Sequence, residues 1–196
     1  MPPLILASTS PYRRELLSRL RLPFEAVAPD VDESALPGEA PGALAERLAL
    51  AKARAVAARH PGAVVIGSDQ VADLDGEAIG KPGTHERAVE QLRRMSGRQV
   101  VFQTAVAVVA PGLAAIERAE VRVRFRVLSD ASIEAYLRTD RPYDCAGSAK
   151  VESLGVALLE AVDSDDPTAL IGLPLIRTCA LLRRAGLDPL ACPPEN

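Results

Sequence analysis

Two stretches in the middle of the chain have the pattern of long β-strands, and they restrict the fold more than any other feature. Residues 99–109 read QVVFQTAVAVV, and residues 120–127 read EVRVRFRV. In the second stretch Val or Phe alternates with Arg, so one face would be buried and the other solvated. We expect the two stretches to pair, which places a sheet at the centre of the molecule.

Shorter strand and helix patterns surround this pair. Residues 43–59, rich in Ala, Leu and Arg, predict the clearest helix. Residues 64–76 predict a strand that breaks at Gly67–Ser68, resumes, and ends in an Asp-Gly turn. Because strands and helices do not alternate strictly, we expect an α/β or α+β domain around one curved sheet. The other expected strands are 4–8, 24–29 and 156–162, and the other expected helices begin at Ser10, Thr84, Ser129 and Pro174.

The composition excludes several classes of protein. The 196 residues are 48% hydrophobic with a formal net charge of −3, which predicts one compact domain or two small lobes around a shared cleft. No apolar run reaches membrane-spanning length, so no membrane partner is expected. The first residues lack a basic region before their apolar stretch, and Arg13 and Arg14 interrupt that stretch early, so a strand is expected there and not a signal peptide.

The cysteine, histidine and aromatic residues narrow the choice further. Cys145, Cys179 and Cys192 are odd in number and widely spaced, which is typical of a reducing cytoplasm. With only His60 and His85 available, a zinc site built on histidine is not expected. A slightly acidic chain with 3% aromatic residues is not typical of a nucleic-acid binder.

Lysine is rare in this chain. Of 23 basic residues only Lys52, Lys81 and Lys150 are lysines. Each is a candidate site residue, because an ammonium and a guanidinium are not interchangeable at a site. Lys52 lies on the helix 43–59, where a solvated surface charge is the alternative. Lys81 lies between Gly80 and Pro82, which could direct it at a phosphate, and Lys150 lies in a stretch of small residues that ends at Glu152.

Hydroxyl groups and carboxylates follow the predicted strands. Ser8, Thr9 and Ser10 lead into a helix that carries Arg13, which indicates either a phosphate site or an ordinary helix cap. Asp69 follows a buried strand, where it could be a general base, a metal ligand or a turn residue.

Two further acidic loops are present in the chain. Asp30, Asp32 and Glu33 could hold Mg²⁺ or form a solvated loop. Asp163, Asp165 and Asp166 precede Pro167 in a loop that leads to the last helix. Taken together, the cations, carboxylates and lack of histidine favour a polyphosphate substrate with Mg²⁺ and a water nucleophile.

Six segments of the chain resemble the Maf family of nucleotide pyrophosphatases, also known as septum-formation-inhibitor proteins. They occur in the family's order and cover nearly the whole chain. The segments are LILASTSPYRRELL at the start, DVDES at 30–34, ERLALAKA at 46–53, IGSDQVADLDGEAIGKP at 66–82, YDCAGSAKVES at 143–153 and GLPL at 172–175. The resemblance implies one domain over residues 1–196, with an elongated, mixed, curved sheet flanked by helices and two lobes around a central cleft. It also implies hydrolysis between the α- and β-phosphates of a nucleotide with a divalent cation, Mg²⁺ or Mn²⁺.

The resemblance also implies roles for individual residues. Asp69 matches the family's catalytic acidic residue, which accepts a proton from water. Lys52 and Lys81 match catalytic positions that hold phosphates, and Glu33 matches one that places the metal together with Asp69. Ser8 and Arg13 match substrate-binding positions, and Tyr12, Gln70 and Glu152 match positions linked to the choice of base.

The subgroup that acts on 7-methyl-GTP is the nearest match, because Gln70 follows Asp69 and CAGS precedes Lys150 and Glu152. A 7-methylated guanine is positively charged, so the ring of Tyr12 would attract it by about 0.5–2 kcal/mol. Glu152 could accept hydrogen bonds from its N–H edge. We therefore expect an enzyme that removes this modified nucleotide. The alternatives are a dTTP/UTP pyrophosphatase of the same family, or a nucleotide-binding regulator of cell division without turnover. A homodimer rests on the resemblance alone.

Overall fold

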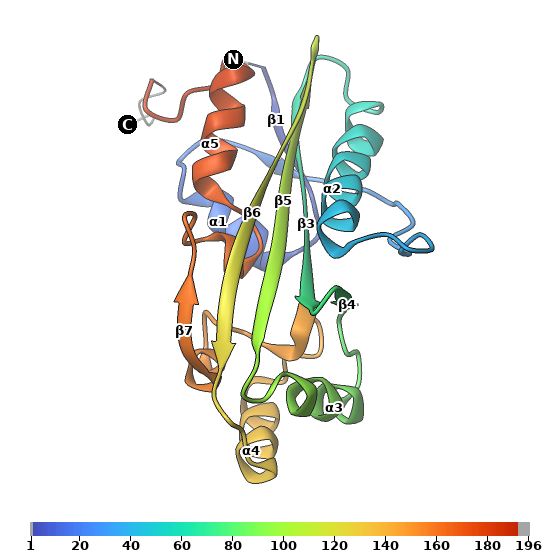
Figure 1. The fold of residues 1–196 in the computed structure, drawn as a ribbon. Helices are drawn as coiled ribbons and strands as arrows, with labels where there is room; N and C mark the ends of the chain where they lie inside the picture. Colours follow the sequence, from blue (N-terminus) through green and yellow to red (C-terminus); the bar gives the residue numbers. More distant parts are fainter. Residues whose placement is uncertain (1, 192–196) are drawn as a thin grey trace.

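One mixed sheet forms the centre of the computed structural model, which describes residues 2–191 (Figure 1). Its seven strands have the order β2-β1-β3-β5-β6-β7, and β4 pairs with the end of β3. β1 is parallel to β2 and β3, and the other pairs are antiparallel. The strands are β1 (Leu4–Ala7), β2 (Glu25–Ala26), β3 (Val64–Leu74), β4 (Glu77–Ile79), β5 (Gln99–Ala110), β6 (Leu113–Phe125) and β7 (Leu159–Asp163). The mixed α/β fold predicted above is therefore confirmed.

The long strands β3, β5 and β6 run side by side through the middle of the molecule (Figure 1). β5 and β6 form a hairpin that is paired from end to end. Val121, Val123 and Phe125 are buried, whereas Arg122 and Arg124 are exposed. The alternation in the sequence thus predicted both the strand and its buried face.

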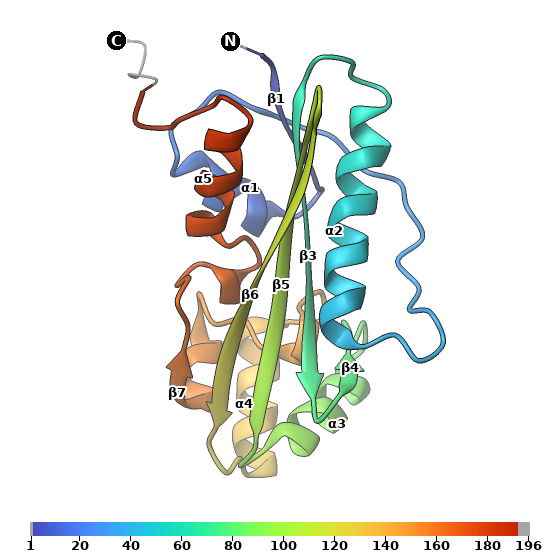
Figure 2. The ribbon, with the colours of Figure 1, turned by 45° about the horizontal axis from the view of Figure 1, so that its top comes forward.

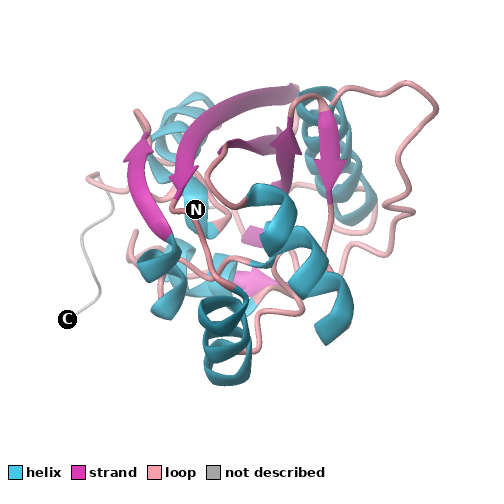
Figure 3. Cartoon of the chain, turned by 60° about the horizontal axis from the view of Figure 1, so that its bottom comes forward, coloured by secondary structure: helices cyan, strands magenta, loops and turns pink. Residues whose placement is uncertain are grey.

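Helices cover both faces of the upper part of the sheet in Figures 1 and 2. Leu4 and Leu6 of β1 pack in the core cluster that contains α1 and α5, and Ile5 and Ala7 pack in the cluster that contains α2. Successive strand residues point to opposite faces, so this short strand separates the two clusters. Figure 3 shows the same arrangement from below. The helices are α1 (Pro11–Ser18), α2 (Pro41–Ala57), α3 (His85–Met95), α4 (Asp130–Asp140) and α5 (Leu175–Arg184).

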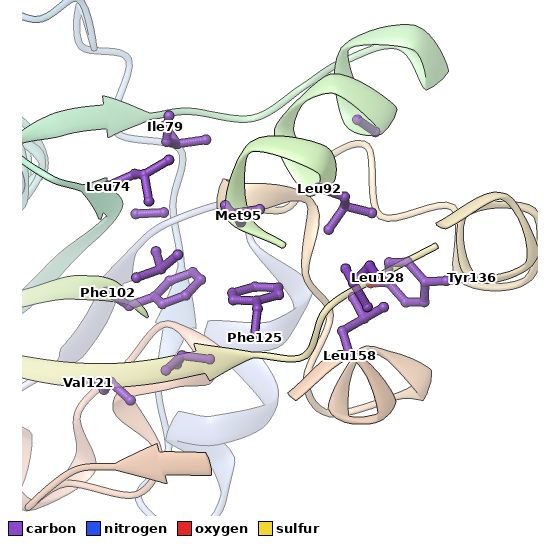
Figure 4. Close-up of a cluster of buried hydrophobic side chains, with 14 of the residues drawn as sticks. Leu74, Ile79, Leu92, Met95, Phe102, Val121, Phe125, Leu128, Tyr136 and Leu158 are labelled. Carbon is purple, nitrogen blue, oxygen red and sulfur yellow. The ribbon is translucent and has the colours of Figure 1, made fainter. Parts of the chain in front are cut away.

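A second lobe surrounds the other end of the long strands. Figure 4 shows Phe102 of β5 and Phe125 of β6 beside Met95 and Leu92 of α3, with Tyr136 of α4 at the far side. These side chains belong to a third core cluster, separate from the two above. The long strands therefore connect two lobes, each with its own apolar packing.

The main error of the sequence prediction concerns β3. A break was expected at Gly67–Ser68, but the strand is continuous from Val64 to Leu74. Gly67 pairs with Ala7 of β1 on one side and with Ala107 of β5 on the other. Backbone hydrogen bonds from two neighbouring strands hold this segment extended, and they outweigh the turn preference of Gly and Ser.

Other boundaries also differ from expectation. The strand expected at 24–29 is only Glu25–Ala26, and the strand expected at 120–127 begins at Leu113. The strand expected at 156–162 begins at Leu159, after a 3₁₀ segment over Leu154–Leu158. Short 3₁₀ turns also form at Ala146–Ser148 and Ala169–Ile171.

Three of the predicted helix starts are confirmed by capping hydrogen bonds, whereas the helix expected at 43–59 spans Pro41–Ala57. The hydroxyl groups of Ser10, Thr84 and Ser129 each accept a bond from the backbone N–H three residues later. Across residues 2–191, no helix is long and apolar enough to cross a membrane. Cys192 lies outside the described residues.

Candidate functional site

Two adjoining cavities are lined by all the predicted site residues except Lys52, which is buried behind them. We call them the α1 chamber, of ≈ 320 Å³, and the α2 chamber, of ≈ 360 Å³. Their shared lining residues are Arg13, Gln70, Lys81 and Ala146. The α1 chamber is also lined by Ser8, Tyr12, Asp144, Cys145, Glu152 and neighbouring residues, and the α2 chamber by Glu33, Leu44, Leu48, Asp69 and others. Residues of both lobes line the α1 chamber, as a central cleft requires.

Gly67 determines how closely α2 packs on β3. A Cβ atom there would lie 2.2 Å from the backbone oxygen of Ala49 and 2.6 Å from the backbone nitrogen of Ala53. Only glycine permits such an approach of helix and strand. Lys52 lies on the same turn of α2, and Asp69 points to the same face of β3 as Gly67, two residues earlier. The close packing therefore brings Lys52 and Asp69 together.

Lys52 lies between two carboxylates. Its Nζ is 2.6 Å from Oδ1 of Asp69 and 2.6 Å from Oε1 of Glu33. Lys52 and Asp69 are only 4% and 7% exposed, so this ion pair is buried. Burial opposes ionisation of Glu33, but the hydrogen bond and charge of Lys52, together with Lys81 and Arg13, lower its pKa. Glu33 is therefore held as a carboxylate beside the buried pair.

Arg13 and Lys81 stand where the two chambers meet. Arg13 Nε donates to the carbonyl oxygen of Gly172 at 2.9 Å. Burial lowers the pKa of Arg13, and the charges of Asp69 and Glu33 oppose that shift. Among residues 2–191, no carboxylate lies within ion-pair distance of Arg13 or Lys81. Both cations are consequently available to an anionic ligand.

An aromatic ring and acidic groups line the α1 chamber. Burial raises the pKa of the Tyr12 phenol, and the nearby Cys145, Asp144 and Glu152 raise it further. Burial also raises the pKa of the Cys145 thiol to about 12, so this thiol stays protonated at neutral pH. Burial raises the pKa of Glu152, while the charge of Lys150 lowers it. This chamber can accept a flat group whose edge donates hydrogen bonds.

The opposite face of β3 fixes the loop that carries Gly172. The Ser68 hydroxyl is 3.0 Å from the Gly172 carbonyl oxygen. The amide nitrogen of Gln70 donates to the carbonyl oxygen of Ala169 at 2.9 Å and to the hydroxyl oxygen of Thr104 at 3.1 Å. The Thr104 hydroxyl in turn donates to the same Ala169 oxygen at 3.0 Å. Because the loop occupies the amide nitrogen of Gln70, only its carbonyl oxygen is left for a ligand.

The sequence analysis did not predict that Thr104 and Ser68 help to hold the loop before α5 in place. Both side chains are fully buried and hydrogen-bonded to the loop before α5. For Thr104 a signal exists, since the polar pair Gln103-Thr104 interrupts an otherwise apolar strand. A buried polar side chain needs a partner, and such a pair marks where another segment of the chain must dock.

Some acidic candidates lie outside the chambers. The carboxylate of Asp32 accepts a hydrogen bond from the Ser34 backbone at 2.9 Å within its own exposed loop, and Asp30 does not line either chamber. Asp166 is buried, but it accepts the backbone N–H of Arg177 at 3.1 Å near the start of α5. Asp32 and Asp166 therefore stabilise a loop and a helix start instead of lining the cleft.

The carboxylates of the site fit a divalent cation that binds together with a phosphate-bearing ligand. Within the described part of the chain, no three His, Cys, Asp or Glu side chains are grouped as a metal site. Glu33 and Asp69 offer two carboxylates beside one ammonium group. Protein-bound Mg²⁺ is commonly held by one or two carboxylates plus substrate phosphates. The residues present therefore fit a divalent cation bound together with a polyphosphate.

The chain is similar to known proteins over nearly its whole length. Residues 3–185 match the Maf-like protein family. The chain is 67% identical to the 7-methyl-GTP pyrophosphatase of Albidiferax ferrireducens over 95% of each chain. It is 69% identical to the protein of the same name from a Polaromonas species, over 94% of this chain and 85% of that one. It is 65% identical to the one from Bordetella pertussis, over 96% and 95%. With this coverage and these identities, the chain belongs to the Maf family.

Proposed function

We propose that this protein hydrolyses 7-methyl-GTP between its α- and β-phosphates and releases 7-methyl-GMP and pyrophosphate. The names of three relatives that are 65–69% identical support the substrate. One structural observation supports the reaction: the buried carboxylate of Asp69, paired with Lys52 at 2.6 Å, lines a chamber whose wall also carries Arg13 and Lys81.

In the proposed reaction, Asp69 accepts the proton of the attacking water. Lys52, Lys81 and Arg13 bind the phosphate oxygens and offset the charge that develops as pyrophosphate leaves. Glu33 and Asp69 would hold a Mg²⁺ or Mn²⁺ ion. Such an ion supplies further neutralisation of phosphate charge when bound. Phosphates would occupy the α2 chamber, and the base the α1 chamber.

The base would stack on Tyr12. Glu152 would accept hydrogen bonds from the base edge, and the carbonyl oxygen of Gln70 stays free to contribute an acceptor. Ser8 lines the same chamber, where its Oγ accepts the Ser10 backbone N–H at 3.1 Å. A ring face and carboxylates together favour a positively charged base over a neutral one.

The Tyr12→Ala variant tests the stacking contact. We expect its kcat/KM to fall about 2- to 30-fold more for 7-methyl-GTP than for GTP, because the cation–π attraction is lost only with the charged base. Pyrophosphate release from both nucleotides measures the effect. Equal losses for the two substrates would contradict the stacking contact.

The Lys52→Arg and Lys81→Arg variants test whether lysine itself is required. Each keeps the charge, but a planar guanidinium cannot replace a compact ammonium held between two carboxylates, as at Lys52. We expect kcat to fall at least about tenfold in each variant. Because Lys81 is exposed, the unfolding temperature of Lys81→Arg should stay close to that of the unmodified protein. Near-normal rates in both would show that the lysines serve another purpose.

A nucleotide panel tests the proposed function itself. Pyrophosphate release is measured with 7-methyl-GTP, GTP, UTP and dTTP in the presence of Mg²⁺ or Mn²⁺. Preferential release from 7-methyl-GTP is expected. Preference for dTTP and UTP would instead identify a pyrimidine nucleotide pyrophosphatase, and nucleotide binding without any release would favour a non-catalytic regulator.

We further propose that residues 1–196 act as one Maf domain, since the long strands pass through both lobes. The free thiols of Cys145 and Cys179 suit the reducing cytoplasm, where a house-cleaning enzyme would meet modified nucleotides. A homodimer that binds neither nucleic acid nor membrane is the proposed state, and light scattering of the purified protein measures its mass.

A further inference from the structure

Of the three lysines, Lys150 has no part in the chemistry described above. Its backbone is tightly held: its N–H donates to the Tyr136 hydroxyl at 2.9 Å, and its carbonyl oxygen accepts from Gly155 N at 3.0 Å. A Cβ on Gly155 would lie 2.4 Å from that oxygen, so only glycine permits this turn. The position from which the Lys150 side chain starts is therefore well defined.

The Lys150 side chain lies beside the α1 chamber, although Lys150 is not itself one of the lining residues. Its Nζ lies 5.5 Å from the centroid of the Tyr12 ring, and that ring lines the chamber. Glu152 lines the same chamber. Throughout residues 2–191, neither Lys150 nor Glu152 has an oppositely charged group within ion-pair distance. An ammonium donor and a carboxylate acceptor thus stand beside one stacking ring, each without an oppositely charged partner.

This pair matches the edge of guanine. A guanine offers an acceptor at its C6 oxygen and donors at N1–H and the 2-amino group. An ammonium can only donate and an ionised carboxylate can only accept. We propose that Lys150 is a specificity-determining residue that donates to the C6 oxygen of the base, while Glu152 accepts from N1–H and the 2-amino group. The inference rests on the function proposed above and adds to it the group that selects an oxygen at C6.

Selection at C6 needs such a donor, because stacking does not provide it. Every base has a flat face, so the Tyr12 ring tolerates different bases. A base with an amino group at C6 would place a donor against the Lys150 ammonium and leave both unpaired. A site built to hydrogen-bond one group rejects an analogue that lacks it for this reason. Lys150 therefore discriminates between 6-oxo and 6-amino purines.

Binding of monophosphates tests this role without turnover. Calorimetric dissociation constants are measured for 7-methyl-GMP, GMP and 2,6-diaminopurine riboside 5′-monophosphate, which has an amino group at C6. The Lys150→Met variant should bind 7-methyl-GMP and GMP about tenfold or more weakly, the loss typical of a hydrogen bond to a charged group. Its affinity for the diaminopurine nucleotide should be equal to or higher than that of the unmodified protein. Lys150→Arg keeps donors at this position and should retain most of the preference for GMP.

Arg138→Met provides a matched control. Arg138 is exposed on α4, in the same lobe, and does not line either chamber, so this variant loses one positive charge without losing the donor. It should bind all three nucleotides like the unmodified protein.

Three results would overturn the role of Lys150. The first is that Lys150→Met weakens the binding of all three nucleotides equally, which would indicate that Lys150 only supports the Tyr12 ring. The second is unchanged binding of all three nucleotides. The third is tighter binding of 7-methyl-GMP. Failure of the proposed function would give a different experimental result. In that case the unmodified protein releases no pyrophosphate from 7-methyl-GTP, whatever its base preference in binding.

Discussion

The Asp69→Asn variant is expected to release pyrophosphate from 7-methyl-GTP about 10²- to 10⁴-fold more slowly, which is the usual contribution of a positioned general base. Asparagine has nearly the same shape as aspartate, but its amide does not accept a proton at neutral pH. The fold should persist, because Lys52 keeps its second partner, Glu33, at 2.6 Å. The measurements are kcat by pyrophosphate release and the thermal unfolding temperature.

The Asp163→Asn variant is the matched control for this experiment. It makes the same chemical change on β7, at an exposed carboxylate that lines neither chamber, so its kcat should equal that of the unmodified protein. Activity of Asp69→Asn above about a tenth of normal would remove Asp69 from the role of base. Recovery at high Mn²⁺ concentration would assign its main role to holding the metal.

The Gly67→Ala variant is expected to lose about 3 kcal/mol of unfolding free energy, at the upper end of the usual cost of overpacking. Its new Cβ would meet the backbone of Ala49 at 2.2 Å, and backbone cannot rotate away as a side chain can. For a chain of this length the unfolding temperature should fall by roughly 10 °C. The helix must also move away from β3 and carry Lys52 away from Asp69, so kcat should fall as well. Urea unfolding and pyrophosphate release measure the two effects.

The Gly42→Ala variant, on α2, separates this contact from a general effect of replacing glycine by alanine. A Cβ on Gly42 would meet only the end of the Arg118 side chain, which is partly exposed and can swing aside. Its stability should therefore stay within about 1 kcal/mol of the unmodified protein. If Gly67→Ala unfolds at the same urea concentration as Gly42→Ala, that result would contradict the tight packing of α2 on β3.

Local patterns in the sequence predicted much of the fold. The Val/Arg alternation of residues 120–127 identified a strand with one buried face, and the hydroxyl groups of Ser10, Thr84 and Ser129 marked helix starts that the structure confirms. These features act between residues that are close in the chain, so they can be read without the fold. The types of side chain also predicted a site of cations and carboxylates, and the ordered segments predicted the Maf family.

The tertiary structure decided which of these side chains meet. Gly67 has the local signal of a turn, yet hydrogen bonds from β1 and β5 keep it within a strand. The alternation of that strand then directs Asp69 to Lys52 on α2, and Gln70 to the opposite side. Arg13 reaches the carbonyl oxygen of Gly172, far along the chain.

The sequence alone therefore determined most of the strands, several helix starts and the chemistry available to this protein. The assembly of the two chambers, and the place of Lys150 over the ring of Tyr12, depended on the fold. The physical reason is that contacts between distant segments depend on strand pairing and on how closely helices pack, and no pattern of neighbouring residues specifies either.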